Sequence, residues 1–163
     1  MKLPDGLTLR PVAETDDGFL RSLFASTRAT ELAYLPGGEA AREIFLRSQF
    51  SAQHQSYSQA FPLARHCIVE IDGVPAGRLY VDATRDPHHV IDVSLLPEYR
   101  QLGIGTRLLQ AVLAEAADAG CDVSLKVEMS NPAARLYDRL GFQTVSSDGL
   151  YLLKIARRSP AID

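Results

Sequence analysis

The segment from Val90 to Val112 limits most strongly what this chain can fold into. A strand-like apolar run ends at Leu96, a turn begins at Pro97, and a sequence without helix breakers runs from Ile104 onward. A strand, a tight turn and a helix in this order direct several backbone N–H groups, at the positive end of the helix dipole, into one small space. The segment therefore predicts an anion-binding turn within an α/β protein, and a diphosphate is the anion that suits it.

Two glycines at alternate positions give this turn its character. Gly103 and Gly105 have no side chain to keep a ligand off the backbone, and glycine adopts positive φ angles readily. Arg100 is expected to add a positive charge at the mouth of the turn. The chain has no Gly-Lys-Ser/Thr sequence, and a dinucleotide-binding turn would need a third glycine where Leu108 stands. On its own, the glycine pair also fits a tight turn without a ligand.

A second block follows a strand-like run that ends at Glu128. In helical terms Asn131 is an N-cap, Pro132 belongs to the first turn, and Gly141 ends the helix. Tyr137 lies six residues after the asparagine. A short capped helix packed on a sheet would explain this block equally well without a ligand.

Together the two blocks resemble the GNAT superfamily of N-acetyltransferases. Arg100-x-x-Gly103-x-Gly105 is similar to the acyl-CoA pyrophosphate loop of that family, and Asn131 to Phe142 is similar to its second cofactor-contacting helix, which ends in Leu-Gly-Phe. The motifs lie within residues 88–143, and the order of elements extends the resemblance over residues 7–83. The resemblance implies direct transfer of an acetyl group from acetyl-CoA to a primary amine in a ternary complex, with no metal.

The hydrophobic pattern predicts one domain, residues 1–163, with alternating strands and helices. The fold class expected is α/β, with an α+β mixed sheet in the order β-α-α-β-β-β-α-β-α-β-β. The resemblance implies a GNAT-like fold, with helices on both faces of a splayed, mostly antiparallel sheet. Asp72-Gly73 predicts a hairpin, and residues 159–163 are expected to be a frayed tail. The expected strands are 7–12, 65–71, 74–83, 89–96, one from 121, one from 142 and 150–155, and the expected helices include 39–59, 104–119 and one from 131.

The resemblance also implies where the acyl donor binds. The strand that ends at Leu95 would splay from its neighbour, so that the N–H of Leu95 or Val93 meets the pantetheine arm or the thioester oxygen. Asn131, besides capping a helix, would bond the pantetheine amide, because its side chain has both a donor and an acceptor. The cofactor-binding residues expected are Val93, Leu95, Leu96, Arg100, Gln101, Leu102, Gly103, Ile104, Gly105, Thr106, Asn131, Ala134 and Tyr137.

Amide formation from a thioester requires an acid for the departing thiolate and a neutral amine. The resemblance assigns the acid to Tyr137, and the alternative is a buried aromatic that only packs. Strand alternation places His89 on one face with Ile91, Val93 and Leu95, and Asp92 on the other. His89 has a suitable pKa for the base. Asp92, Glu128 and a chain of waters are the competing candidates, and a solvent-exposed turn histidine is the alternative interpretation.

His89 lies six residues from Leu95, about 20 Å along an ideal strand. A bulge or a water relay would therefore be needed to bring His89 or Asp92 to the thioester. The acceptor groove is the part least fixed by motifs. Its aromatic, mildly acidic lining would suit a small amine or a peptide N-terminus. Its expected lining includes Phe24, Tyr34, Gln53, His54, Tyr57, Tyr80 and Tyr151.

Composition excludes several other classes of protein. A chain of 163 residues with a net charge of −3 and no basic run does not predict a nucleic-acid surface. No stretch is apolar enough to predict a membrane span. Cys67 and Cys121 lack metal-ligand spacing and are expected to be buried free thiols in a reducing, cytoplasmic setting. We expect acetyl-CoA and an amine as partners, no metal, and a monomer or homodimer.

Two alternatives to an acetyltransferase remain at this stage. One is a catalytically inactive module of the same fold that binds acyl-CoA as a sensor or structural element. The other is an unrelated α/β protein that binds a nucleotide at its glycine turn. The second lacks an acidic ribose-binding residue at the expected distance after the turn.

Overall fold

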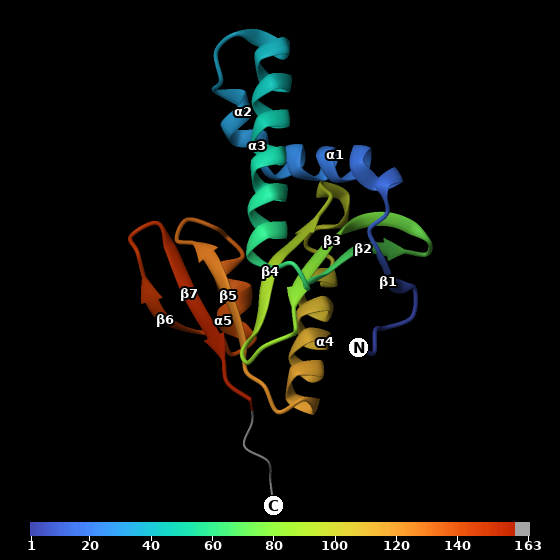
Figure 1. The fold of residues 1–163 in the computed structure, drawn as a ribbon, viewed down its shortest axis with the longest axis vertical. Helices are drawn as coiled ribbons and strands as arrows, with labels where there is room; N and C mark the ends of the chain where they lie inside the picture. The colour runs from blue at the N-terminus through green and yellow to red at the C-terminus, as the bar shows by residue number, and fades with distance from the viewer. Residues whose placement is uncertain (159–163) are drawn as a thin grey trace, which may run out of the picture.

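A computed structural model describes residues 1–158, so the expected frayed tail at 159–163 lies outside the described residues. The chain forms one sheet of seven strands in the order β1-β2-β3-β4-β5-β7-β6 (Figure 1). Within residues 1–158, β4 and β5 are the one parallel pair, and every other neighbouring pair is antiparallel. The strands are β1 (Leu7–Pro11), β2 (Arg65–Ile71), β3 (Val74–Asp82), β4 (His88–Leu95), β5 (Val123–Glu128), β6 (Gln143–Ser147) and β7 (Tyr151–Ala156).

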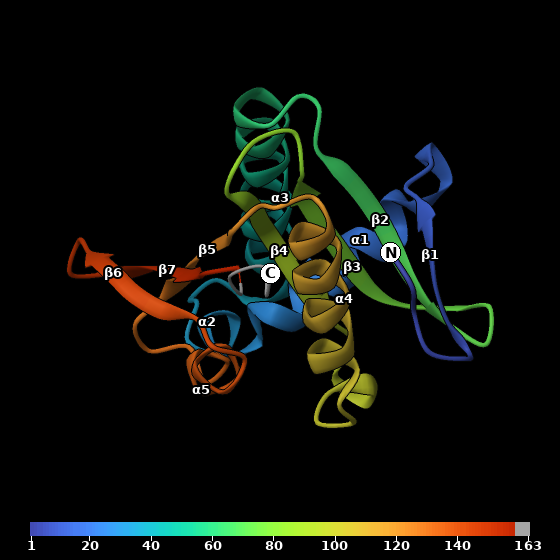
Figure 2. The same ribbon diagram turned by 90° about the horizontal axis from the view of Figure 1, so that it is seen from below.

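Helices cover both faces of this sheet, as expected (Figure 2). On one face lie α1 and α3, which pack against each other, and on the other face lie α4 and α5. The helices are α1 (Asp17–Thr27), α2 (Ala29–Ala33), α3 (Gly38–Ala60), α4 (Ile104–Asp118) and α5 (Ala134–Arg139). Single 3-10 turns precede α1 and follow β4, at Glu14–Asp16 and Pro97–Tyr99. None of the helices within residues 1–158 is both long enough and apolar enough to cross a bilayer.

The larger hydrophobic core fills the space between the sheet and α4. It includes the fully buried Leu108, Leu109 and Val112 of α4, and Val69 and Val81 of the sheet. The opposite face has a smaller core in which Leu20 and Phe24 of α1 meet Phe50 of α3 over Ile68. The helix periodicity seen in the sequence thus describes α4 well, because an apolar stripe repeated at that spacing must face one core.

The local turn chemistry explains most of the boundaries. Asp72 and Gly73 both adopt positive φ angles, 49° and 79°, and form the expected hairpin between β2 and β3. The expectation for Asn131 was wrong in register, because α5 begins at Ala134. The side-chain Oδ1 of Asn131 instead accepts a hydrogen bond of 2.9 Å from the N–H of Ala133, which closes the turn before the helix. Cys67 and Cys121 are free thiols, but both are half-buried instead of fully buried.

The parallel strands β4 and β5 are paired over a short distance only. Their register runs from His88↔Val123 to Val90↔Leu125 and then stops. Beyond this point β4 stays paired with β3, and β5 stays paired with β7. The two strands therefore diverge in the middle of the sheet, and this divergence is the splay that the resemblance implied.

A bulge in β4 changes which side chains share a face. Tyr80 of β3 pairs with Asp92, but Val81 pairs with Val90, so that Ile91 is an extra residue on β4. Val90 packs on the α4 core, and Val93 and Leu95 pack there too, although an unbroken strand would place Val90 on the opposite face from both. The expectation that His89 shares a face with Val93 and Leu95 was therefore wrong.

Candidate active site

The turn between β4 and α4 presents a row of backbone N–H groups. Within residues 1–158, no group accepts a hydrogen bond from the N–H of any of residues 101–106, and the first bond of the helix runs from Arg107 N–H to Gly103 C=O at 3.1 Å. These donors lie at the start of a helix of 15 residues, where the helix dipole adds a partial positive charge. The turn can therefore bind an anion with several acceptor oxygens.

The two glycines of the turn have different conformations. Gly103 is the residue before α4 and has φ of 77°, whereas Gly105 lies inside the first turn of α4 and has no positive φ. The expectation of positive φ thus holds for Gly103 alone. A Cβ atom built on Gly103 would meet nothing within 4 Å, and one built on Gly105 would meet only Leu136 Cδ2, at 3.8 Å. The space in front of both residues is open, so that a ligand can approach this backbone closely.

Arg100 has a role that its position in the motif did not predict. Its Nε donates to the carbonyl of Leu95 at 2.8 Å, and a terminal nitrogen donates to the hydroxyl of Ser26 at 3.0 Å. The side chain thus links the end of β4 to α1 across the mouth of the turn. The guanidinium is exposed, so its charge still adds to the positive potential at the turn.

The end of β4 offers further backbone donors on its open side. Leu96 donates its N–H to the carbonyl of Ala76, toward β3, at 2.9 Å. Because successive N–H groups of a strand point to opposite edges, those of Val93 and Leu95 point away from β3. The ladder with β5 has already ended at Val90, so these two N–H groups face the opening between the strands.

A cavity of about 320 Å³ lies at this opening. It is lined by β4 from Val90 to Ser94 and by β5 from Leu125 to Glu128, and it reaches both faces of the sheet. Asn131 and Tyr137 line it from the α5 side. From the α1 and α3 side it is lined by Leu20, Leu23, Phe24, Thr27, Arg28, Gln53 and Tyr57, together with Glu31 of α2, Arg78 of β3 and Tyr151 of β7.

Tyr137 lines the cavity and also packs its ring against the core. The ring meets Phe142 edge-on, with 5.9 Å between centroids, and borders the larger core. Burial, followed by the negative charge of Asp92, raises the pKa of Tyr137 to about 12. The phenol is therefore protonated throughout the physiological range and is suited to donate a proton.

Asn131 also borders the cavity, with one half of its amide engaged. Its Oδ1 accepts from Ala133 N–H, and its backbone carbonyl accepts from Ala134 N–H. The side-chain NH₂ group makes no hydrogen bond to any group of residues 1–158. It is thus a donor available to a ligand, while the other half of the same amide shapes the turn before α5.

A buried ion pair that the motifs did not reveal lies at the centre of the cavity. Arg78 is 7% exposed, and its guanidinium donates to Asp92 Oδ2 at 2.7 Å and to Gln53 Oε1 at 2.9 Å. Ser94 donates to the same Asp92 oxygen at 2.9 Å. The second oxygen, Oδ1, accepts no hydrogen bond from the described chain, so that it remains available to a ligand.

His89 lies outside this cavity, at the closed end of the two strands. Its ring stacks on Phe61, with 5.3 Å between centroids, and its Nδ1 is 2.9 Å from the hydroxyl of Ser124. Burial, aided by the charge of Arg85, lowers the pKa of His89. The bulge at Ile91 places His89 on the same face as Asp92, but only Asp92 of the two lines the cavity.

The acceptor residues expected from the sequence divide into two groups. Phe24, Gln53, Tyr57 and Tyr151 line the cavity. Tyr34 is 84% exposed, His54 stacks on Phe50, and Tyr80 lies behind Tyr57 against His66, so that none of these three lines it. The expected acidic character was also wrong, because the carboxylates of Glu31, Asp92 and Glu128 are matched by the cations Arg28, Arg78 and Lys126.

Sequence reasoning missed the cationic residues of the cavity. Arg78 did carry a signal, because it is the one charged residue in the run from Ala76 to Val81. A charge within an apolar strand indicates a buried partner. Arg28 follows a helix and has no comparable signal in its neighbours.

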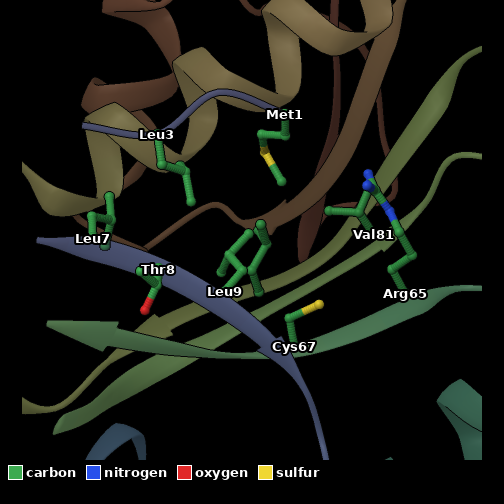
Figure 3. Close-up of a pocket in the computed structure, with 9 residues that line it drawn as sticks. Met1, Leu3, Leu7, Thr8, Leu9, Arg65, Cys67 and Val81 are labelled. Carbon is green, nitrogen blue, oxygen red and sulfur yellow. The ribbon is translucent and has the colours of Figure 1, made fainter. Parts of the chain in front are cut away.

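A second cavity, of about 420 Å³, lies elsewhere in the molecule. Met1 and Leu3 point toward Leu9 of β1 and Cys67 of β2 across it (Figure 3). Its lining is mostly apolar and shares no residue with the cavity between β4 and β5. Residues 1–158 contain no cluster of three or more side chains that could hold a metal ion, either here or at the first cavity.

One known protein that is similar to part of this chain is an acetyltransferase. In a stretch of 61 residues it is 48% identical to an N-alpha-acetyltransferase of Sulfurisphaera tokodaii, and this stretch is 35% of this chain and 36% of that protein. The match thus spans only about a third of the length of that relative.

Solved structures with a similar fold cover nearly the whole chain. One is the PaiA N-acetyltransferase of Thermoplasma acidophilum in complex with coenzyme A, with a TM-score of 0.69, 20% identity, and coverage of 93% of this chain and 98% of that one. Another is Arabidopsis thaliana Naa50 in complex with the bisubstrate analogue CoA-Ac-MVNAL, with a TM-score of 0.57, 16% identity, and coverage of 92% and 97%. At these identities the similarity shows the fold alone.

The family follows from a match of a different kind. Residues 36–142 match the model of the acetyltransferase (GNAT) family, and this range is more than half of the chain. It includes the glycine turn, the diverging strands and the segment from Asn131 to Phe142. The chain therefore belongs to the acetyltransferase (GNAT) family.

Proposed function

We propose that this protein transfers an acetyl group from acetyl-CoA to the primary amine of a small molecule or a peptide N-terminus, by direct attack in a ternary complex. The observation that carries this proposal is the cavity between β4 and β5, which is lined from both faces of the sheet. A donor on the α5 face and an acceptor on the α3 face can meet there without either one crossing the core.

The donor side of the proposal rests on backbone groups. The free N–H groups of residues 101–106 would bind the diphosphate, as helix N-termini bind other anions. The N–H groups of Val93 and Leu95 and the NH₂ of Asn131 would hold the pantetheine arm along the open edge of β4. This arrangement would place the thioester between β4 and Tyr137.

The chemistry then needs few groups. The amine nitrogen forms a bond to the acetyl carbon, the carbon–sulfur bond breaks, and the sulfur leaves as a thiolate that takes a proton. Tyr137, whose pKa is raised to about 12, would supply that proton. A backbone N–H of Val93 or Leu95 would stabilise the oxyanion on the former carbonyl oxygen.

Asp92 is the group best placed to meet the incoming amine. Its Oδ1 has no partner among residues 1–158, and its Oδ2 is held by Arg78 and Ser94, so that the carboxylate is fixed in orientation. It would accept an N–H of the ammonium and pass its proton to solvent, directly or through a water. Glu128, at the end of β5, is the competing carboxylate in the cavity.

The proposal is tested by mixing the protein with acetyl-CoA and a panel of amines and measuring thiol release. We expect release with at least one amine, and CoA alone should raise the melting temperature by mass action on the native state. A raised melting temperature without thiol release on any amine would favour the inactive acyl-CoA-binding module. No change with CoA, but a rise with ATP or NAD, would contradict the family-based assignment of the turn.

A further inference from the structure

Two guanidinium groups line the cavity, and one of them has a buried N–H without an acceptor in residues 1–158. Arg28 lines the cavity, and its Nε–H is buried without a hydrogen-bond acceptor in residues 1–158. Arg78 lies on the sheet at the same cavity, with its Nε and one terminal nitrogen engaged by Asp92 and Gln53. A buried N–H on a charged group is costly to leave without an acceptor.

The contacts of Arg28 hold its guanidinium without using this donor. A terminal nitrogen pairs with Glu31 at 3.1 Å, in a solvent-exposed ion pair of the kind that contributes little. The guanidinium lies over the ring of Phe24, 5.2 Å from its centroid. The group is thus oriented against an aromatic face, while its Nε still needs an acceptor.

The other charged residues of the cavity have partners. Lys126 pairs with Asp148 at 3.4 Å and lies over the ring of Tyr151. Glu128 accepts a hydrogen bond from the hydroxyl of Tyr151. Arg28 Nε is thus a buried donor without an acceptor, and Asp92 Oδ1 is an oxygen of an oriented carboxylate that accepts no hydrogen bond from residues 1–158.

Both groups line the same cavity as Tyr57. The Arg78 guanidinium that holds Asp92 lies over the Tyr57 ring, 6.0 Å from its centroid. Burial is the main reason that the pKa of Tyr57 is raised, and the charges of Asp92, Arg78 and Arg28 also act on it, in keeping with this arrangement. A ligand with one positive and one negative group would satisfy both.

We propose that the acceptor is an amine that also carries a carboxylate, with its ammonium at Asp92 and its carboxylate at Arg28. This inference rests on the proposed function and names its substrate class. An amine whose other groups are all cationic would bring like charge against Arg28 and Arg78. The carboxylate has two possible sources, the α-carboxylate of a free amino acid or the acidic side chain of an N-terminal residue.

The test compares matched amines in which a carboxylate is replaced by the neutral amide. One arm uses L-leucine and L-leucinamide, and the other uses the peptide amides Asp-Ala-Ala and Asn-Ala-Ala. We expect kcat/KM to be at least about 10-fold higher for the acid in one of the pairs, which identifies the source of the carboxylate. Equal values within both pairs, or a preference for the neutral members, would overturn the inference.

The variant Arg28→Gln tests whether Arg28 causes the preference for the carboxylate. It should raise KM for the preferred acid about 10- to 100-fold, with little change in kcat, and leave KM for the neutral partner unchanged. Arg21→Gln is the matched control, because Arg21 lies on α1, the helix that Arg28 directly follows, and pairs with Asp17 outside the cavity. An equal loss for both members of the pair would show that Arg28 is structural and would overturn its assignment.

A binding measurement separates this inference from the proposed function. With CoA present, the preferred acid should raise the melting temperature more than its neutral partner, and Arg28→Gln should abolish the difference. If no amine releases thiol, the proposed function fails, and this measurement still decides whether the cavity selects a carboxylate. Equal shifts for acid and amide in the wild-type protein would overturn the inference.

Discussion

The two sides of the opening between β4 and β5 differ in the kind of polar group that they present, backbone groups on one side and side chains on the other. On the α4 and α5 side, the donors without a partner in residues 1–158 are backbone N–H groups of one continuous segment, residues 101–106. On the α1 and α3 side, the polar groups are side chains such as Arg28, Gln53 and Arg78, which come from three separate elements. The first side is a property of one turn, whereas the second exists only when distant parts of the chain pack together.

This difference teaches how one fold can keep its donor and change its acceptor. Backbone N–H groups are retained under almost any substitution that preserves the turn, so a diphosphate site tolerates sequence change. The acceptor side rests on a small core of Leu20, Phe24, Phe50 and Ile68, and its polar residues lie at the edge of that core. Substitutions there alter charge and shape without disturbing the larger core on α4.

The largest effect is expected at Tyr137, where the two sides meet. Tyr137→Phe should lower turnover by about 10²- to 10⁴-fold, because the ring still packs on Phe142 while the proton for the thiolate is lost. The affinity for CoA should change little. Steady-state kinetics and a CoA titration check both values, and unchanged turnover would reduce Tyr137 to a packing residue.

Asp92 tests the acceptor side. Asp92→Asn should lower turnover by about 10²-fold, because the amine loses its carboxylate. It should also lower the free energy of unfolding by about 1–3 kcal/mol, since the buried Arg78 loses its anionic partner. Turnover measurements and urea unfolding check the two effects, and full activity with reduced stability would show that Asp92 only holds Arg78.

His89 provides the control for Asp92 on the same strand. It lies on the same face but packs against Phe61 and Ser124 outside the cavity. His89→Gln should therefore leave the profile of turnover against pH unchanged. Loss of an acidic limb in this variant would restore His89 as the base and contradict the assignment to Asp92.

Gly105 tests the donor side with two effects of opposite sign. Gly105→Val should weaken CoA binding by at least about 10-fold, because a branched side chain would occupy the space where the phosphates lie. The free protein should be no less stable, because valine has a better helix propensity than glycine and Gly105 is not at positive φ. CoA titration and thermal unfolding measure both, with Gly105→Ala as a graded control, and wild-type affinity would show that the diphosphate lies elsewhere.

The smallest expected effect is on the pH dependence of the free energy of unfolding, and it comes from His66. This residue lies next to Tyr80, which in turn contacts Tyr57 of the cavity. Its ring stacks on Tyr80 at 4.2 Å, and burial is the first cause that lowers its pKa to about 4. The histidine is therefore protonated near pH 6.5 in the unfolded chain but only near pH 4 in the native protein. The free energy of unfolding consequently falls as the pH drops from about 6.5 to 4.

His66→Phe keeps the stacking and removes this titration. Urea unfolding at pH 7 and pH 5 should show a smaller loss of stability in the variant, with a remainder from His89, whose pKa is also lowered. The CoA-induced rise in melting temperature should not depend on this residue, because backbone N–H groups do not titrate. An unchanged loss of stability would show that His66 is protonated equally in both states.

The sequence predicted most of the local structure on the α4 and α5 side, for a physical reason. The turn at Gly103 and the amphipathic pattern of α4 depend on residues close together in the chain, and local conformation follows from local sequence. The same holds for the hairpin at Asp72-Gly73. The register of α5 was missed by three residues, because Asn131 uses its side chain to close a turn before the helix instead of capping it directly.

The acceptor side was predicted less well, because its geometry depends on long-range packing. Arg78 reaches Gln53 across 25 positions of sequence, and no local pattern records such a contact. Tyr34 and Tyr57 look alike in the sequence, yet one is almost fully exposed and the other lines the cavity. The bulge at Ile91 had a stronger effect still, since it reversed the face of His89 relative to every later residue of β4.

The bulge at Ile91 shifts the alternation of side chains along β4 by one residue. Before Ile91, the alternation of side chains places Val90 on the core, and after it the same face is taken by Val93 and Leu95. If Ile91 instead took part in regular alternation, Asp92 and Ser94 would share the core face with Val90, and Val93 and Leu95 would turn away from it. A carboxylate would then enter the core. Deletion of Ile91 would leave the observed faces unchanged, so the bulge is what keeps Asp92 on the cavity side while Ile91 is present.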